Sequence, residues 1–255
     1  MKRLSLIIAS MLVLGTQSYC QEKDKSIQVL VFSKTEGFRH ESITNGIKAL
    51  WEIGQKSNWN VTATEDAAYF NDEFLNSFDV VVWLNTTGDV LNPEQEAAFV
   101  RWYRRGKGYV GIHSATDTEY DWPWYGQLIA GAYFKTHPAT QHGTLIVEST
   151  DHPSMDLFRR MNMKTWTVVD EWYTFRASPR DAVNVLLSLD EETVIDKGNN
   201  PKEVIMGDHP IAWWHHFDGG RAFYTERGHT PESFDEPLFR SHLKGAIEWA
   251  AGKSE

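Results

Sequence analysis

Cysteine is almost absent from this sequence: its 255 residues include a single one, Cys20. A disulfide framework is therefore excluded, and the chain after residue 20 holds no thiol that could act as a nucleophile. No Gly-x-Gly-x-x-Gly fingerprint follows an expected strand, and no P-loop occurs. We therefore expect no cofactor that carries hydride or phosphate.

Basic residues are fewer than acidic ones. The sequence has 25 Lys and Arg and 35 Asp and Glu, which gives a formal net charge of −10. Such an acidic surface is a poor partner for nucleic acid and for anionic lipid. A membrane span is not expected either. The apolar run from Leu4 to Leu14 is too short to cross a bilayer.

Residues 1–20 have the pattern of a signal peptide. Lys2 and Arg3 precede the apolar run, and small or polar residues then lead up to Cys20. The sequence thus predicts export to the periplasm, with residues 21–26 as a short linker and residues 27–252 as one domain. Cys20 has two interpretations: cleavage before Gln21 would release the protein, whereas a lipid on Cys20 would make it a lipoprotein.

In the first half of the domain, short apolar runs alternate with helical patterns. Strands are expected at 27–33, 61–64, 79–85 and 108–113, and helices from Ile43 through Trp51 and at 93–105. This alternation is typical of a parallel sheet covered by helices on both faces. The expected fold class is α/β and flavodoxin-like.

The second half is less regular. Strands are expected at 144–148, 183–189, 212–217 and 221–226, and an amphipathic helix from Glu236 to about Ala251. Asp218-Gly219-Gly220 separates two aromatic-rich runs, a pattern that favours a hairpin turn. We therefore expect a mainly parallel sheet with a β-hairpin added in the C-terminal half.

Polar residues collect where the first, third and fourth expected strands end. The three loops are Lys34–His40, Asn85–Asp89 and His113–Glu119. Ligands of open α/β sheets bind outside the carboxyl ends of the strands. The candidate ligand-binding residues in these loops are Lys34, Arg39, His40, Thr87 and Ser114.

Several longer stretches resemble the ThuA-like (trehalose utilisation) family, in order and over nearly the whole domain. They are VFSKTEGFRHESI (31–43), VVWLNTTGDVL (81–91), GYVGIHSATDTEYDWPWYGQLIAGAYFKTHP (108–138), DEWYTF (170–175), HPIAWWHHFDGGRAFYTERGHTPESF (209–234) and the end at 247–252. The resemblance implies a fold similar to that of class I glutamine amidotransferases and a role in carbohydrate catabolism. In that fold the turn after the fourth strand carries a cysteine nucleophile, where this chain has His113. The chain is therefore not a cysteine-dependent glutaminase.

His113 is the first candidate for chemistry. An imidazole that titrates near neutrality can transfer protons, with Asp117 or Glu171 as the group that orients it. We predict His113, Glu171 and Asp117 as catalytic residues. Ser114 could instead act as a nucleophile, but its surroundings lack the glycine pattern of a nucleophile elbow.

A divalent metal, zinc or a similar ion, is the second interpretation of the histidines. None of them has a recognised ligand spacing such as His-Glu-x-x-His, so distant loops would have to assemble such a site. The candidate ligands are His40, His113, His137 and His229, which could converge with Glu171. The sequence leaves open whether a metal binds at all.

Aromatic residues are frequent, with 11 Trp, 9 Tyr and 13 Phe. Trp172 and Tyr173 follow Glu171, and a carboxylate beside aromatic rings suits the binding of a sugar. Trp122 is a similar candidate, and Arg227 and His229 after the last expected strand are candidates for binding a substrate oxygen.

The sequence leaves three functions open. The first is an enzyme, a hydrolase, lyase or isomerase, that acts on a disaccharide, glycoside or keto-sugar. The second is a carbohydrate-binding protein without catalysis, and the third is a hydrolase of amides or esters. A small-molecule carbohydrate is the expected partner in the first two, and a homo-oligomer is left open.

Overall fold

The computed structural model describes residues 25–196 and 204–253. The predicted signal peptide, Cys20 and the linker up to residue 24 lie outside these residues. None of the described helices is long and apolar enough to cross a membrane.

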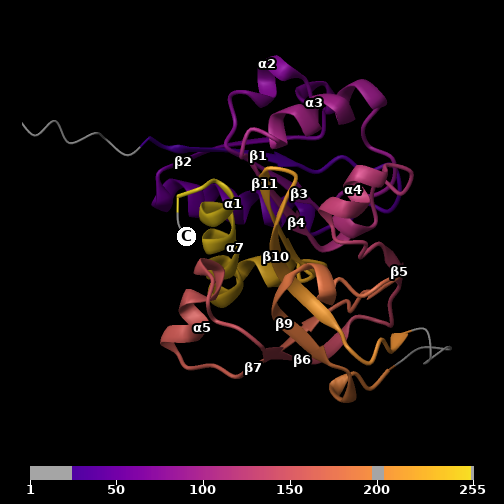
Figure 1. Ribbon diagram of the computed structural model, residues 1–255. Helices are drawn as coiled ribbons and strands as arrows, with labels where there is room; N and C mark the ends of the chain where they lie inside the picture. The colour runs from indigo at the N-terminus through magenta and orange to yellow at the C-terminus, as the bar shows by residue number, and fades with distance from the viewer. Residues whose placement is uncertain (1–24, 197–203, 254–255) are drawn as a thin grey trace, which may run out of the picture.

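A nine-stranded sheet forms the centre of the described chain (Figure 1). Its order is β2 (Trp59–Thr64), β1 (Ile27–Phe32), β3 (Val80–Leu84), β4 (Gly108–Ile112), β11 (Gly220–Thr225), β10 (Pro210–Phe217), β9 (Asn184–Asp190), β6 (Gln141–Val147) and β7 (Thr165–Asp170). The pairings from β2 to β11 are parallel, and those from β11 to β7 are antiparallel. Only β10 and β6 therefore run against the common direction. The carboxyl ends of β1, β3, β4, β11 and β7 meet one edge of the sheet.

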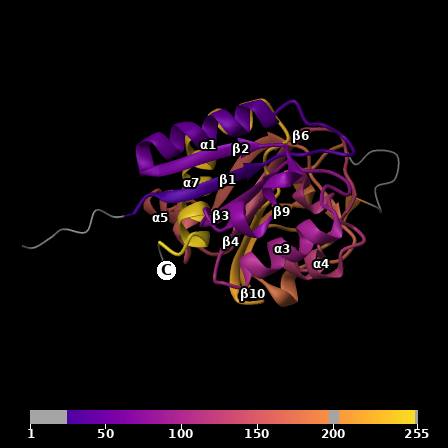
Figure 2. The same ribbon diagram turned by 90° about the horizontal axis from the view of Figure 1, so that it is seen from above.

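Helices cover both faces of the sheet, because alternate residues of the central strands are buried on opposite sides. Val29 and Val31 of β1 join the cluster beneath α1 (Ile43–Ser57) and α7 (Pro237–Ala250). Leu30 and Phe32 join the other cluster, beneath α2 (Asp72–Leu75), α3 (Pro93–Tyr103) and α4 (Pro123–Leu128). Figure 2 shows α1 on one side and α3 and α4 on the other. The predicted fold class is confirmed.

The remaining elements are short and lie in the connections. A further α-helix, α5, spans Asp156–Arg160, and 3-10 turns occur at Ala67–Tyr69, His113–Thr116, Pro153–Met155, Arg180–Ala182, Glu191–Thr193 and Pro231–Asp235. The hairpin expected around Asp218 is present, with β10 and β11 paired antiparallel. Asp218 and Gly219 both have positive φ, 43° and 90°, which the tight turn requires.

The sequence did not predict β7, nor the two-stranded ribbon of β5 (Phe134–Thr136) and β8 (Thr174–Phe175). In β7, Thr165, Thr167 and Val169 are exposed and alternate with buried Trp166 and Val168. This segment alternates exposed and buried residues, unlike the continuous buried runs of β3 and β4. The ribbon's strands are shorter than β7, and long-range pairing rather than local pattern produces them.

Close packing of the last helix on β4 gives a prediction for stability. A Cβ placed on Gly108 would lie 2.3 Å from the carbonyl oxygen of Ala250 in α7. Because backbone cannot give way cheaply, Gly108→Ala should lower the free energy of unfolding by about 1–3 kcal/mol. Urea denaturation measures this, with the exposed Lys48→Ala as the control. Equal stability of Gly108→Ala and wild type would show that α7 is not packed this tightly.

Candidate metal centre

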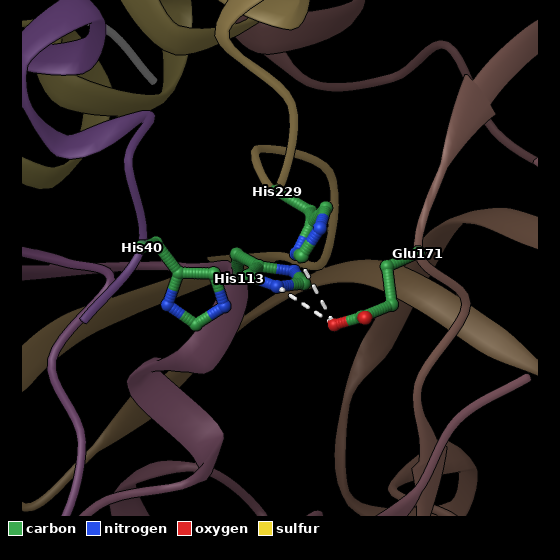
Figure 3. Close-up of side chains that lie close together, drawn as sticks. All are labelled: His40, His113, Glu171 and His229. Carbon is green, nitrogen blue, oxygen red and sulfur yellow. Dashed lines mark ion pairs between the residues drawn. The ribbon is translucent and has the colours of Figure 1, made fainter. Parts of the chain in front are cut away.

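Four side chains from four separate loops converge at the carboxyl edge of the sheet (Figure 3). His40 follows β1, His113 follows β4, His229 follows β11 and Glu171 follows β7. Their potential ligand atoms all lie within 4.8 Å of one another. The same direction of β1, β4, β11 and β7 explains why residues so far apart in sequence meet here.

The backbone at His113 aims its side chain into this cluster. His113 has a positive φ of 49° where the chain turns sharply out of β4, and its side chain is fully buried. Its Nδ1 lies 2.8 Å from the carbonyl oxygen of Glu226 and so donates a hydrogen bond to it. The tautomer assigned on this basis leaves Nε2 without a proton, 3.5 Å from Oε2 of Glu171.

Glu171 stands between the imidazoles. Its Oε2 lies 3.2 Å from Nδ1 of His229, and its Oε1 lies 3.0 Å from Nδ1 of His137. Burial alone would raise the pKa of the Glu171 carboxyl, but the surrounding imidazoles outweigh burial and hold that pKa well below its usual range. Glu171 is therefore a carboxylate.

His40 is a neutral imidazole in this setting. Burial, together with repulsion from the neighbouring His113 and His229, lowers the pKa of His40 to about 2. Contact with Glu171 acts in the opposite direction on His137 and raises its pKa. His137 is also more exposed than the other three histidines, at the mouth of the site.

Two ring nitrogens of the cluster are left without a hydrogen-bond partner. Nε2 of His113 and Nδ1 of His229 are buried and make no aligned hydrogen bond, although both lie near the Glu171 carboxylate. Unpaired buried polar atoms cost free energy, and a cation placed among them would remove that cost. Neutral imidazole and ionised carboxylate are the states that bind a divalent metal. The cluster fits such an ion.

A second carboxylate, that of Asp170, fixes the positions of Glu171 and His229 relative to each other. It is fully buried and accepts hydrogen bonds from the backbone N–H of Gly228 (3.1 Å), the backbone N–H of His229 (3.0 Å) and the hydroxyl of Ser233 (3.0 Å). Because Asp170 immediately precedes Glu171, these bonds tie the end of β7 to the loop that carries His229. Outer contacts of this kind orient metal ligands.

The His40 loop is held from the neighbouring strand. The hydroxyl of Thr87 donates to the carbonyl oxygen of Phe38 (2.9 Å) and accepts from the N–H of Gly37 (3.2 Å). The hydroxyl of Ser114 lies 3.4 Å from Nδ1 of His40. Thr87 and Ser114 were predicted to bind substrate, but both are fully buried and position His40 instead.

A cavity of about 290 Å³ opens above the cluster. It is lined by Phe38, His40, Asp117, Phe134, His137, Glu171, Tyr173 and His229. The ring of Tyr173 lies 4.4 Å from that of His113 and 4.3 Å from that of Phe134, so one wall is aromatic. Asp117 supplies a carboxyl whose pKa is raised by burial, and the hydroxyl of Tyr120 donates to its Oδ1 at 2.5 Å.

Trp172 and Arg227 do not reach this cavity, contrary to the expectation from sequence. Trp172 points to the opposite side from its neighbours Glu171 and Tyr173, where Nε1 donates to the carbonyl oxygen of Gln141. Arg227 is buried with its guanidinium over the ring of Trp166 and pairs with Glu236. Both side chains stabilise the fold beneath the loops.

Lys34, Trp122 and Arg39 also lie elsewhere. Lys34 and Trp122 line a separate cavity of about 510 Å³ next to Glu119, which with Asp89 and Glu96 forms a group of carboxylates. Arg39 is half exposed and pairs with Glu65. Position in a strand-end loop did not determine on which side of the loop each side chain lies.

Three residues of the site, Phe38, Phe134 and Asp170, were not predicted from the sequence. Phe134 comes from the unpredicted ribbon, so no local signal would have placed it near His113. Asp170 did carry a signal, since it is an acidic residue between the apolar end of a strand and Glu171. Phe38 lies between Gly37 and Arg39 in a loop that stood out only for its charged residues.

The fold and the cluster together define a class: an α/β protein with a candidate metal centre of three histidines and a glutamate at the carboxyl edge of its sheet. The family model described as ThuA, trehalose utilisation, matches residues 28–250. The chain belongs to this family.

Solved structures with a similar fold include two proteins described as ThuA-like. One, from Bacteroides uniformis ATCC 8492, is 22% identical with a TM-score of 0.72, and the match covers 93% of this chain and 97% of that one. The other, from Parabacteroides merdae ATCC 43184, is 20% identical with a TM-score of 0.69, covering 90% and 92%. A cytoplasmic protein of Salmonella typhimurium LT2 is 11% identical with a TM-score of 0.58, covering 88% and 99%. No curated protein matches the sequence.

Asp170→Asn tests the role of the buried clamp. The N–H groups of Gly228 and His229 bind separate oxygens of Asp170, so the NH2 group of asparagine would face one of these two donors and the His229 loop should shift. We expect zinc affinity to fall by about 10–100-fold, as for other outer-shell changes. Competition titration with a chromophoric chelator measures the affinity, and circular dichroism checks folding. The control is Asp235→Asn on the exposed surface of the same segment, and equal affinities in both variants would contradict the clamp.

The separate carboxylate group predicts a pH dependence of stability. Burial raises the pKa of Glu119 to about 8, with repulsion from Asp89 and Glu96 adding to it and the N–H groups of Leu91 and Val90 opposing it. The folded protein thus binds this proton more tightly than the unfolded chain, whose glutamate titrates near 4.5. Stability should be lost as pH rises from about 4.5 to 8.

Glu119→Gln isolates this effect, because glutamine retains an acceptor for both N–H groups and does not ionise. Urea denaturation of both proteins between pH 5 and pH 8 should show a smaller loss of stability in Glu119→Gln. Parallel curves for the two proteins would show that Glu119 has an ordinary pKa.

Proposed function

We propose that this protein is a metal-dependent enzyme of carbohydrate catabolism. A divalent ion, zinc or a similar metal, would be held by His40, His113, His229 and Glu171. The convergence of these four groups, whose ligand atoms lie within 4.8 Å of one another, carries the proposal. Family membership supports the carbohydrate, and the aromatic wall of Phe134 and Tyr173 supports a ring-shaped substrate.

The proposal gives His113 a different role from the one expected from sequence. Its Nδ1 is bound to the Glu226 carbonyl, and the side chain is fully buried and is not among the residues that line the cavity, so it would not meet a substrate directly. His113 would hold the metal. A bound divalent ion supplies Lewis acidity toward a carbonyl or hydroxyl oxygen of the sugar.

Proton transfer then falls to Asp117. Its carboxyl lines the cavity, comes from the loop that follows His113, and is held in place by Tyr120. A carboxyl next to the substrate and outside the metal ligands can accept or deliver the proton of a sugar carbon or oxygen. His137 would orient Glu171 through Oε1, at 3.0 Å.

The two alternatives have less support. An amide or ester hydrolase that uses Ser114 would need the serine hydroxyl to meet the substrate, but Ser114 is fully buried and is not among the residues that line the cavity. A binding protein without catalysis could use the same cavity. Asp117 lines the same cavity as His40, Glu171 and His229, and this placement favours catalysis over binding alone.

The site of action is part of the proposal. Residues 1–20 have the pattern of a signal peptide, so the substrate would be met in the periplasm. Cell fractionation with an antibody to the folded domain would locate the protein. Recovery of the full-length chain in the cytoplasm would contradict export.

Metal removal is the first test. The protein from Gln21 onward should bind one equivalent of zinc, and Glu171→Gln should bind it at least about tenfold more weakly because a charged ligand is lost. Dialysis against a chelator should remove both metal and any turnover of trehalose, other glucosides or their 3-keto forms, and added zinc should restore both. The exposed His142→Ala is the control. Full turnover in metal-free protein would reject the metal-dependent mechanism.

Asp117→Asn separates chemistry from metal binding. This variant should keep its zinc and its ligand affinity while turnover, followed by mass spectrometry of the products, falls by about 10²–10⁴-fold. Asp121→Asn is the matched control, since it lies in the same loop but lines the other cavity. Undiminished turnover in Asp117→Asn would show that Asp117 does not transfer the proton. If the wild-type protein bound a sugar tightly but formed no product, the carbohydrate-binding protein would be favoured instead.

A further inference from the structure

A second hollow adjoins the cavity above the metal centre. It has a volume of about 300 Å³ and is lined by Phe38, His40, Glu41, Thr140, His229, Thr230, Pro231 and Glu232. Three of these residues, Phe38, His40 and His229, also line the first cavity of about 290 Å³. The two hollows therefore meet at the histidines, one on each side.

We propose that the second hollow is a subsite for the second unit of a two-unit ligand, a neutral and hydroxyl-rich group such as a second sugar ring. The bond that joins the two units would lie over His40 and His229, next to the metal. This inference rests on the proposed function and deepens it, because it assigns the second half of the substrate and the residues that select it.

The sizes of the hollows support one unit in each. Pockets for small molecules begin at about 300 Å³, so each hollow alone is at the lower end of that range and together they reach the size of an ordinary ligand site. Phe38 stands between them with 65% of its surface exposed. An exposed aromatic ring at this junction can contact the apolar faces of both units.

The chemistry of the two hollows differs. Each is lined by two acidic residues, Asp117 and Glu171 in the first and Glu41 and Glu232 in the second. The first also has the aromatic wall of Phe134 and Tyr173, whereas the second has Thr140 and Thr230. No cation of the described residues lies within ion-pair distance of Glu41 or Glu232. Carboxylates that have no cationic partner accept hydrogen bonds from hydroxyl groups and repel anions. The second unit should therefore be an uncharged polyol rather than a phosphorylated or acidic sugar.

Binding affinity tests this subsite without relying on turnover. Calorimetry of the zinc-loaded protein compares trehalose, maltose, cellobiose and sucrose, each against the methyl glucoside of matching anomeric form. At least one disaccharide should bind about tenfold or more tightly than its methyl glucoside, because a second unit adds hydrogen bonds to charged groups. Equal affinity of every disaccharide and its methyl glucoside would overturn the proposal.

Thr140→Trp fills the second hollow and should abolish this advantage, so that the affinity ratio of disaccharide to methyl glucoside falls toward one. Glu232→Gln should reduce the ratio in part and weaken discrimination against trehalose 6-phosphate. Thr44→Trp, on the exposed surface of α1, is the control and should retain the wild-type ratio. A ratio unchanged by Thr140→Trp would place the second unit elsewhere.

The two proposals fail in different ways. Failure of the metal-dependent mechanism would show in measurements of zinc content and turnover. The variants Thr140→Trp and Glu232→Gln instead test the relative affinity for disaccharide and methyl glucoside. A disaccharide preference that disappears in Thr140→Trp would uphold the subsite even in a protein with no turnover. Metal-dependent turnover of methyl glucosides and disaccharides at equal kcat/KM, with equal affinity, would refute the subsite and leave the metal centre in place.

Discussion

The site depends on one buried negative charge, the carboxylate of Glu171, which lies among imidazoles rather than beside a lysine or an arginine. Nε2 of His113 and Nδ1 of His229 lie 3.5 and 3.2 Å from its Oε2, and neither of these contacts is an aligned hydrogen bond. Of these two nitrogens, Nε2 of His113 carries no proton in the tautomer that its Nδ1 hydrogen bond to Glu226 sets, so it cannot donate to the carboxylate. A shared cation is the simplest way to stabilise them together.

The rest of the structure serves to bring these groups together. Strands β1, β4, β11 and β7 end at the same edge although β6 and β10 run the other way, and the loops that carry His40, His113, His229 and Glu171 follow from that arrangement. Asp170 then fixes the spacing of Glu171 and His229 through backbone N–H groups. The sheet determines which residues meet, and the hydrogen bonds determine how closely.

Much of this could be predicted from the sequence, for physical reasons that differ between elements. Buried runs such as Val80–Leu84 and the capped start of α3 are local signals, so the central strands and the two long helices of the first half were predicted correctly. Because carboxyl ends of parallel strands share an edge, His40 and His113 could be grouped from their positions in the chain alone. The convergence of His229 and Glu171 required the resemblance to the family in addition, because β7 was not recognised as a strand.

The direction in which each loop side chain points could not be predicted from the sequence. Trp172 lies between Glu171 and Tyr173 but points away from both, and Arg227 precedes His229 by two residues yet packs on Trp166. Neither direction follows from local pattern, since long-range packing decides it. Phe134 enters the cavity for the same reason, through a ribbon formed by strands of two and three residues.

X-ray absorption at the zinc edge of the zinc-loaded protein tests the metal centre most directly, because it reports the atoms bound to the metal. We predict a first shell of nitrogen and oxygen at about 2.0–2.2 Å with the outer-shell scattering of about three imidazoles. Conversion of His113, His229 or His40 to alanine should remove one imidazole from that signal. A shell of oxygen alone, without imidazole scattering, would show that the metal binds elsewhere and would contradict a centre built from these histidines.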